Sequence, residues 1–335
     1  MIKVLVVDDS SFMRVNIKTL LMTAGDIEVI GIARTGSEAI EKAQALKPDV
    51  ITMDINMPDM SGIEAVEHIM KTYPVPIIMI SSLTFEGAEE TIQALEKGAV
   101  DYINKSQLSK EALINKIRIA AEASVDLDAG ESIEHGQMPS VSRSFEIIGI
   151  GISTGGPRAL AKFLPELDAG IPASIVIAQH MPPAFTKSLA ERLNAECSIK
   201  VKEAEHGETL QPGCAYILPG GKHGKVKRNG VLSLYTKADF PKQLYTPSAD
   251  VLMSSMARVY KNKALCIIMT GMGSDGLEGA RVIKKYGGYV IAQSESSSTI
   301  FGMPKAIIQN NLQDEIIHLE DLGPRINQLS IGDQR

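Results

Sequence analysis

Cysteine is scarce in this sequence, and the few cysteines are far apart. The 335 residues include three of them, Cys197, Cys214 and Cys266, and no C-x-x-C pair. This spacing argues against a disulfide framework and a zinc site, and it is typical of a protein kept in a reducing compartment. We therefore expect a cytoplasmic protein whose thiols are small buried hydrophobic groups.

Long apolar runs and blocks of basic residues are also absent. No stretch of about 18 uninterrupted apolar residues occurs, so the sequence predicts no membrane insertion. The amino-terminal apolar run is short and ends in acids, unlike a secretory signal peptide. The net charge is -6 and no lysine- or arginine-rich block occurs, so we expect no nucleic-acid partner.

The sequence does contain enough apolar residues for two globular domains. Hydrophobic residues make up 44% of the chain and charged residues 22%, as in ordinary soluble proteins. Residues 123–144 lose hydrophobic periodicity and gather serine, glycine and acids, which is typical of a flexible linker. We expect one domain over residues 1–122 and another over residues 145–335.

Both halves alternate apolar runs with amphipathic segments. Five strand and helix pairs in residues 1–122 predict a doubly wound, parallel α/β sheet. Residues 145–335 predict a second, Rossmann-like α/β domain with a mostly parallel sheet, an antiparallel hairpin at the Asn229-Gly230 turn and a closing helical segment after residue 294. Ligands of such sheets bind beyond the carboxyl ends of the strands.

Acids, a hydroxyl and a lysine stand at those ends in the first half, at Asp8, Asp9, Asp54, Ser81 and Lys105. Carboxylates that converge on one rim repel one another and favour a hard cation such as Mg²⁺. A lysine and a hydroxyl beside them would neutralise and hydrogen-bond a phosphoryl group. The set therefore predicts an aspartyl phosphate on Asp54.

Residues 1–122 resemble a response-regulator receiver domain. The resemblance rests on the acidic pair, on the D-x-x-M-P motif at residues 54–58, and on Ser81, Tyr102 and Lys105. It implies that Asp54 accepts a phosphoryl group from a histidine kinase and that Ser81, Tyr102 and Lys105 form the switch. The implied Mg²⁺ ligands are Asp8, Asp9, Asp54 and the carbonyl of Asn56.

One position departs from the receiver pattern. The family usually has proline after the lysine, and Ser106 stands there instead. The cis peptide bond common at that place is not expected before a residue other than proline.

The second half opens on IIGIGISTGGP, residues 147–157, which predicts a buried strand turning into a helix over residues 157–167. Its G-x-S-x-G spacing, centred on Ser153, is that of a nucleophile elbow. Two other interpretations fit the same residues. One is a phosphate or dinucleotide loop at the helix N-terminus, and the other is a plain turn with Ser153 or Thr154 as N-cap.

A serine nucleophile requires a base, an acid that orients the base, and an oxyanion hole. His180 and Asp275 each follow a predicted strand, so in a parallel sheet they would reach the same rim as Ser153. The amides of Met272 and Thr154 are candidate oxyanion donors. The rivals are His206 and His223 for the base and Asp250 for the acid.

Residues 145–335 resemble the catalytic domain of the chemotaxis protein-glutamate methylesterases. The matching segments are GISTGG, QHMPP, TPSADV, TGMGSDG and FGMP, and a receiver in front is that family's architecture. The resemblance implies no cofactor in this domain and assigns the nucleophile, base, acid and oxyanion amide to Ser153, His180, Asp275 and Met272. Ile152 stands where alanine is common, and Thr246 stands where arginine usually precedes Pro-Ser.

The resulting hypothesis is a phosphorylation-gated hydrolase of glutamate methyl esters on methyl-accepting chemotaxis receptors. It would release methanol, with deamidation of receptor glutamine as a side activity. A noncatalytic nucleotide-binding domain is a rival, weakened because Gln179 and His180 stand where a ribose-binding acid belongs. A triad that acts on another ester or amide is a second rival, which Thr246 leaves open.

Overall fold

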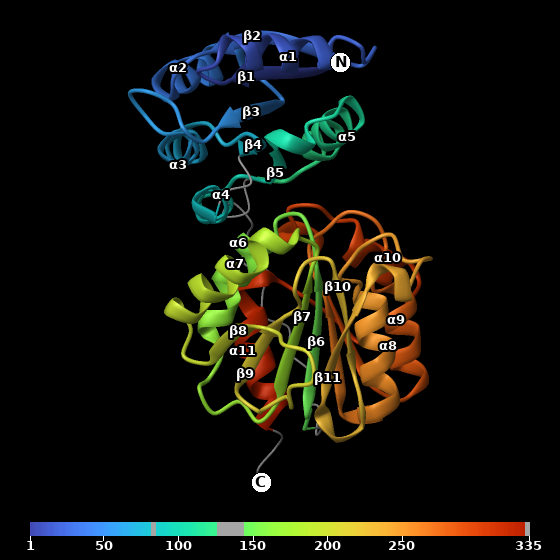
Figure 1. Cartoon of the computed structure of the whole chain (residues 1–335). Helices are drawn as coiled ribbons and strands as arrows, with labels where there is room; N and C mark the ends of the chain where they lie inside the picture. Colours follow the sequence, from blue (N-terminus) through green and yellow to red (C-terminus); the bar gives the residue numbers. More distant parts are fainter. Residues whose placement is uncertain (82–84, 126–143, 332–335) are drawn as a thin grey trace. The chain divides into compact units, whose positions relative to one another are not determined.

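A computed structural model describes residues 1–81, 85–125 and 144–331. The chain divides into two compact units, Met1–Asp126 and Leu127–Arg335 (Figure 1). Most of the expected linker, residues 126–143, lies outside the described residues. In the described part of the chain, no helix has the length and apolar character needed to cross a membrane.

The first unit is a five-stranded parallel sheet in the order β2-β1-β3-β4-β5, with helices on both faces. Its strands are β1 (Ile2–Val7), β2 (Ile27–Ala33), β3 (Val50–Asp54), β4 (Ile77–Ser81) and β5 (Asp101–Asn104). Its helices are α1 (Ser11–Leu21), α2 (Gly36–Leu46), α3 (Gly62–Thr72), α4 (Phe85–Glu96) and α5 (Lys110–Ala121). The alternation of apolar runs and amphipathic segments in the sequence predicted a doubly wound parallel sheet, and the structure confirms it.

Strands β3 and β4 are buried along their whole length because helices cover both faces of the sheet. Val4, Val6, Ile78 and Ile80 are fully buried in the core beneath α1 and α5. After β3, a capping box starts α3: Ser61 Oγ accepts from the Glu64 N–H, and the Glu64 carboxylate accepts from the Ser61 N–H. The cap fixes the loop between Asp54 and α3.

The second unit has a seven-stranded parallel sheet in the order β14-β13-β12-β6-β7-β9-β8 and a separate antiparallel pair, β10-β11. The strands are β6 (Ile147–Ile152), β7 (Ser174–Gln179), β8 (Lys200–Glu203), β9 (Cys214–Ile217), β10 (Lys222–Val226), β11 (Leu232–Thr236), β12 (Ala264–Ile268), β13 (Tyr289–Gln293) and β14 (Glu315–Ile317). The helices are α6 (Gly156–Phe163), α7 (Pro183–Glu196), α8 (Ala249–Tyr260), α9 (Leu277–Lys285), α10 (Met303–Gln309) and α11 (Leu319–Ile331).

Helices α8, α9 and α10 cover one face of this sheet, and α6, α7 and α11 cover the other (Figure 1). Strand β6 lies in the middle, between β12 and β7. The later elements are added on opposite sides of β6, so the carboxyl end of β6 is a topological switch point, where doubly wound sheets bind their ligands.

The predicted hairpin is present. Asn229 (φ 69°) and Gly230 (φ 71°) both take the left-handed conformation between β10 and β11, which two-residue turns of this kind require. Two details differ from the prediction. Strand β14 lies in the segment expected to be helical, and the helix expected to reach residue 167 gives way after Phe163 to a 3₁₀ turn, where Pro165 lacks the N–H that an α-helix needs.

Candidate active site

Ser153 directly follows β6, and both its N–H and its carbonyl make hydrogen bonds. Its N–H donates to the Thr270 carbonyl at 2.9 Å, and its carbonyl accepts from Nε2 of Gln179 at 3.0 Å. Gly271 lies so close that a Cβ there would be 2.6 Å from Cβ of Ser153. The serine itself stays partly exposed. The sheet therefore presents one fixed, accessible hydroxyl at its rim.

His180 follows β7, the neighbouring strand, and pairs with Asp275. Its N–H donates to the Ile152 carbonyl at 3.0 Å, which places it beside the end of β6. Nε2 of His180 lies 2.8 Å from Oδ2 of Asp275. A carboxylate only accepts, so Nε2 carries the hydrogen. Nδ1 is buried, has no partner in the described structure, and is therefore the nitrogen left to take up a proton.

In the described residues no hydrogen bond joins the hydroxyl of Ser153 to His180. Catalytic hydrogen bonds are often loose before substrate binds and tighten in the complex. The strand ends thus bring the expected serine, histidine and aspartate to one rim, with the histidine and aspartate in direct contact.

Asp275 accepts hydrogen bonds from the start of helix α8 as well as from His180. Oδ1 accepts from Ser248 Oγ at 2.9 Å and from the Asp250 N–H at 3.1 Å, and Oδ2 accepts from the Ala249 N–H at 2.7 Å. Burial opposes ionisation of this carboxyl, but the hydrogen bond and charge of His180 and the helix amides outweigh burial and lower its pKa. Asp275 is accordingly an anion aimed at the imidazole.

Asp250, the rival acid, is engaged elsewhere. Its Oδ1 accepts from the N–H groups of Gly276 at 2.9 Å and Gly279 at 2.7 Å, at the start of α9. Each of the two helices is therefore capped by an acid from the other's segment, Asp275 for α8 and Asp250 for α9. Burial, with the charge of Asp275 nearby, raises the pKa of Asp250 to about 6. Of the two acids, Asp275 is therefore the one in hydrogen-bond contact with His180.

Amides suited to an oxyanion hole flank the serine. The Met272 N–H and the Thr154 N–H have no hydrogen-bond partner among the described residues. The Thr154 carbonyl accepts from Thr270 Oγ1 at 2.9 Å, which ties the serine loop to the segment that leads into Met272. Both predicted donors therefore border Ser153 with their N–H groups available.

Neither rival histidine contacts the serine or Asp275 through a hydrogen bond in the described structure. His206 Nδ1 accepts from the Leu234 N–H at 3.1 Å, on strand β11. His223 is buried on β10, with Nε2 3.4 Å from Thr246 Oγ1, and burial lowers its pKa. A neutral, buried His223 serves as a packing partner of Thr246.

The structure does not favour the other two interpretations of the serine turn, the N-cap and the phosphate loop. The N-cap of α6 is Gly155, which has no side chain to accept a hydrogen bond, so neither hydroxyl caps the helix. At the helix start, the Gly156 N–H already donates to the Ser153 carbonyl at 2.8 Å and Pro157 has no N–H. Few amides remain there for a phosphate.

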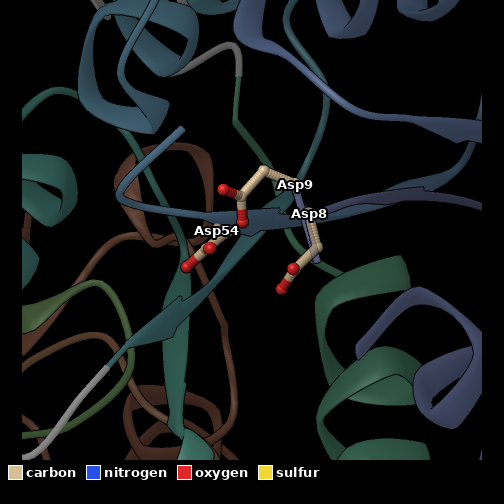
Figure 2. Close-up of side chains that lie close together, drawn as sticks. All are labelled: Asp8, Asp9 and Asp54. Atoms are coloured by element: carbon tan, nitrogen blue, oxygen red, sulfur yellow. The ribbon is translucent and has the colours of Figure 1, made fainter. Parts of the chain in front are cut away.

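In the first unit, Asp8, Asp9 and Asp54 gather at the carboxyl ends of β1 and β3, with their carboxylates close together (Figure 2). One oxygen from each lies within 4.8 Å of the others. Nζ of Lys105 lies 2.8 Å from Oδ1 of Asp54 and 3.9 Å from Oδ2 of Asp8. The predicted convergence of acids and lysine is present.

The donor set fits a divalent cation. Burial, with the charge of Asp54, raises the pKa of Asp8 to about 6. Burial also raises the pKa of Asp54, although Lys105 opposes it. Oδ2 of Asp8 is buried without a hydrogen-bond partner in the described structure. An oxygen-binding cation such as Mg²⁺ would offset the repulsion between the carboxylates and would give Oδ2 of Asp8 a ligand bond.

The remaining predicted receiver residues lie on β4, on β5 and in the loop after β3. Ser81 is buried at the end of β4, and no hydrogen-bond partner for its Oγ lies among the described residues. Tyr102 lies on β5, with Lys116 Nζ 5.8 Å from its ring centroid. The side chain of Asn56 points to Glu90, with Nδ2 donating at 3.2 Å.

Ser106 confirms the expected trans bond. The cis bond found in the described chain is Thr246-Pro247, not Lys105-Ser106. The Ser106 N–H donates to Oδ1 of Asn104 at 2.9 Å, a bond that proline could not make.

The sequence of the second unit matches the family model for CheB methylesterase over residues 148–326, more than half of the chain. The chain belongs to the CheB methylesterase family. Residues 4–118 match the response regulator receiver domain. The predicted architecture, a receiver followed by a methylesterase domain, is confirmed.

Relatives of this family match the chain from end to end. A protein-glutamate methylesterase/protein-glutamine glutaminase of Lawsonia intracellularis is 45% identical over 351 residues, which cover 97% of this chain and 98% of the relative. A protein of the same name from Thermotoga maritima is 45% identical over 334 residues, 94% of this chain and 95% of the relative. The crystal structure of the Thermotoga maritima CheB methylesterase catalytic domain matches with a TM-score of 0.53 and 41% identity, covering 56% of this chain and 99% of that domain.

Two residues of this CheB-family site were not predicted as functional. The Tyr245 ring stacks on the His180 imidazole with centroids 4.3 Å apart. Gln179 is 1% exposed, and its Nε2 donates to the carbonyls of Ser153 at 3.0 Å and His180 at 3.3 Å. The sequence signals were their positions: Tyr245 directly precedes the segment TPSADV, and Gln179 is the first residue of QHMPP.

Proposed function

We propose that the chain is a phosphorylation-activated serine hydrolase that demethylates glutamate methyl esters on methyl-accepting chemotaxis receptors and deamidates receptor glutamines. The observation that carries the proposal is the contact between His180 and Asp275 at the rim that presents Ser153. The relatives' name, protein-glutamate methylesterase/protein-glutamine glutaminase, supplies the substrate class.

In the proposed reaction, Ser153 Oγ attacks the ester carbonyl while Nδ1 of His180 takes the hydroxyl proton. Asp275 holds the imidazole through Nε2 and stabilises its positive charge. The N–H groups of Met272 and Thr154 stabilise the oxyanion. The bond to the methoxy group then breaks, and the proton passes from His180 to the departing methoxide, which leaves as methanol.

Water completes the cycle. His180 takes a proton from the water that attacks the acyl-enzyme, and the bond to Ser153 Oγ breaks with return of that proton to the serine. A glutamine side chain follows the same steps and releases ammonia. The catalytic domain, placed at residues 145–335, uses no cofactor in this scheme.

Regulation is assigned to the receiver, placed at residues 1–122, with Asp54 as phosphoacceptor and a chemotaxis histidine kinase as donor. Asp8, Asp9, Asp54 and the Asn56 carbonyl would hold Mg²⁺, which neutralises charge on the carboxylates and the phosphoryl oxygens. Lys105 binds the phosphoryl group, and Ser81 and Tyr102 pass on the change. The proposed compartment is the cytoplasm, where the kinase acts.

Methanol release from methylated receptor membranes tests the chemistry. Ser153→Ala should abolish it, and unchanged release would reject the assignment. For regulation, the wild type and Asp54→Asn are compared with a small phosphodonor and Mg²⁺. Stimulation of the wild type alone supports the gating, whereas equal stimulation of both contradicts it.

A further inference from the structure

The ring of Tyr245 lies parallel to the imidazole of His180. The two centroids are 4.3 Å apart and the planes differ by 7°. Because Nε2 of His180 is bonded to Asp275 at 2.8 Å, the imidazole is fixed along one edge by a carboxylate and on one face by an aromatic ring. An aromatic face attracts a neighbouring ring and attracts a cation more strongly.

The same short segment that carries Tyr245 also holds Asp275. Three and four residues after the tyrosine, Ser248 Oγ and the Ala249 N–H donate to the Asp275 carboxylate at 2.9 Å and 2.7 Å. Residues 245–250 therefore contact both members of the His180–Asp275 pair. A shift of this segment would move the base and its orienting acid together.

The phenol end of Tyr245 reaches the turn that follows the candidate oxyanion amide. A Cβ added at Gly273 would lie 3.1 Å from the tyrosine oxygen, and Gly273 has a φ of 85°. Met272 immediately precedes that glycine. The ring thus extends from the imidazole to the loop of Met272, while the next residue back, Leu244, is 84% exposed.

We infer that Tyr245 is a positioning residue for the hydrolysis, one that acts through His180. Its ring holds the imidazole in the plane that directs Nδ1 to Ser153 and stabilises the imidazolium formed when Ser153 gives up its proton. This inference rests on the proposed function. It does not require contact between Tyr245 and the substrate, so it predicts an effect on kcat rather than on KM.

Three substitutions test it in the full chain. Tyr245→Leu removes the aromatic face, Tyr245→Phe keeps it, and Tyr286→Leu makes the same change at a residue that is 38% exposed at the C-cap of α9. The measurements are kcat and KM for methanol release, the rate of Ser153 labelling by a fluorophosphonate, and the unfolding temperature. The labelling rate reports the reactivity of the serine without a receptor.

For Tyr245→Leu we expect kcat and the labelling rate to fall about tenfold, the range of a lost aromatic or cation–π contact, with KM unchanged. Tyr245→Phe should restore most of both rates, and Tyr286→Leu should change neither. If Tyr245→Leu lowers the unfolding temperature more than Tyr286→Leu does, Tyr245→Met replaces it as the non-aromatic variant. The same results are then expected for its kcat, KM and labelling rate.

A wild-type labelling rate in the non-aromatic variants would overturn the inference, as would a higher KM at constant kcat, since that marks a substrate contact. Failure of Tyr245→Phe to restore the rates would also overturn it. The proposed function fails separately: methanol release by Ser153→Ala, or no labelling of Ser153 in the wild type, would reject it whatever the Tyr245 variants do.

Discussion

Nε2 of His180 and Oδ2 of Asp275 are 2.8 Å apart, and the same carboxylate accepts hydrogen bonds from the first two backbone N–H groups of α8. One side chain therefore both orients the imidazole and caps a helix. The geometry of the site is coupled in this way to the packing of α8.

Asp275→Asn should lower kcat by roughly 10³- to 10⁴-fold, the loss seen when a triad acid is replaced by its amide. The amide offers one acceptor oxygen, whereas the carboxylate offers two. Some of the donors that now bind the carboxylate, which are His180 Nε2, Ser248 Oγ and the helix amides, would therefore face an NH₂ donor. Steady-state methanol release measures the effect. Circular dichroism verifies that the variant is folded.

Asp250→Asn is the matched control, because it makes the same change in the neighbouring helix-capping acid. Its Oδ1 still accepts from Gly276 and Gly279, so kcat should stay within about threefold of wild type, below the loss expected for a triad residue. Equal losses in the two variants would mean that the acids act as caps alone, and would remove Asp275 from the mechanism.

The pH dependence of stability provides a second use of Asp250→Asn. Burial raises the folded-state pKa of Asp250 to about 6 from its ordinary value of 3.8. The folded protein holds this proton more tightly, so the group's stabilising contribution is present below the unfolded pKa and is lost as the pH rises through about 6.

An asparagine cannot ionise and avoids that loss. At pH 7 the variant should be more stable than wild type by about 1 kcal/mol, less than the full shift implies because the side chain is partly exposed. The difference should shrink as the pH falls from 6 to 4. Thermal unfolding of both proteins across this range measures it, and a constant difference would contradict the pKa assignment.

Gln179 offers a test of how the serine loop is held. Its Nε2 joins the carbonyls of Ser153 and His180, and Gly156 makes room for it, since a Cβ there would lie 2.0 Å from Oε1. Gln179→Met keeps the volume and removes the donor. We expect a loss of about 1–3 kcal/mol in unfolding free energy from the two lost hydrogen bonds, because the His180 carbonyl loses this donor and the Ser153 carbonyl keeps the Gly156 N–H.

The same change should lower kcat by up to about 10²-fold, since small displacements of a nucleophile are costly. Gln309→Met, at an exposed position in α10, is the control and should alter neither quantity. A wild-type kcat in Gln179→Met would show that the strand ends hold Ser153 without this side chain.

Much of this arrangement follows from simple patterns in the sequence. Apolar runs separated by amphipathic segments specify parallel strands, and polar residues directly after those runs converge because parallel strands end on one edge. Ser153, His180 and Asp275 were predicted in this way, as were Asp8, Asp9 and Asp54. Their convergence depends on sheet topology more than on any side-chain detail.

The remainder depends on contacts between segments far apart in the chain. Asp250 and Asp275 each stand near a helix start, and only the packing of α8 against α9 decides that each caps the other helix. The stacking of Tyr245 on His180 has no periodic signal, because it joins two loops. Strand β14 has three residues, too few for an alternation to reveal.

The close packing of Gly62 against the backbone at Asp54 yields the last prediction. A Cβ at Gly62 would lie 2.0 Å from the Asp54 carbonyl oxygen, and the Gly62 N–H donates to the Ile55 carbonyl at 2.7 Å. Gly62→Ala must displace the backbone at Asp54 and Ile55, because the atoms nearest the added Cβ are all backbone atoms.

We expect Gly62→Ala to destabilise the receiver by about 1–3 kcal/mol, the usual cost of overpacking, and to slow phosphorylation of Asp54 by a small phosphodonor. Gly25→Ala is the matched control, since a Cβ at Gly25 meets no atom within 4 Å. Phosphorylation is followed by Phos-tag electrophoresis, and stability by thermal unfolding. If both variants match wild type, the β3–α3 loop is more compliant than its contacts imply, and the position of Asp54 is set by the sheet and Lys105 alone.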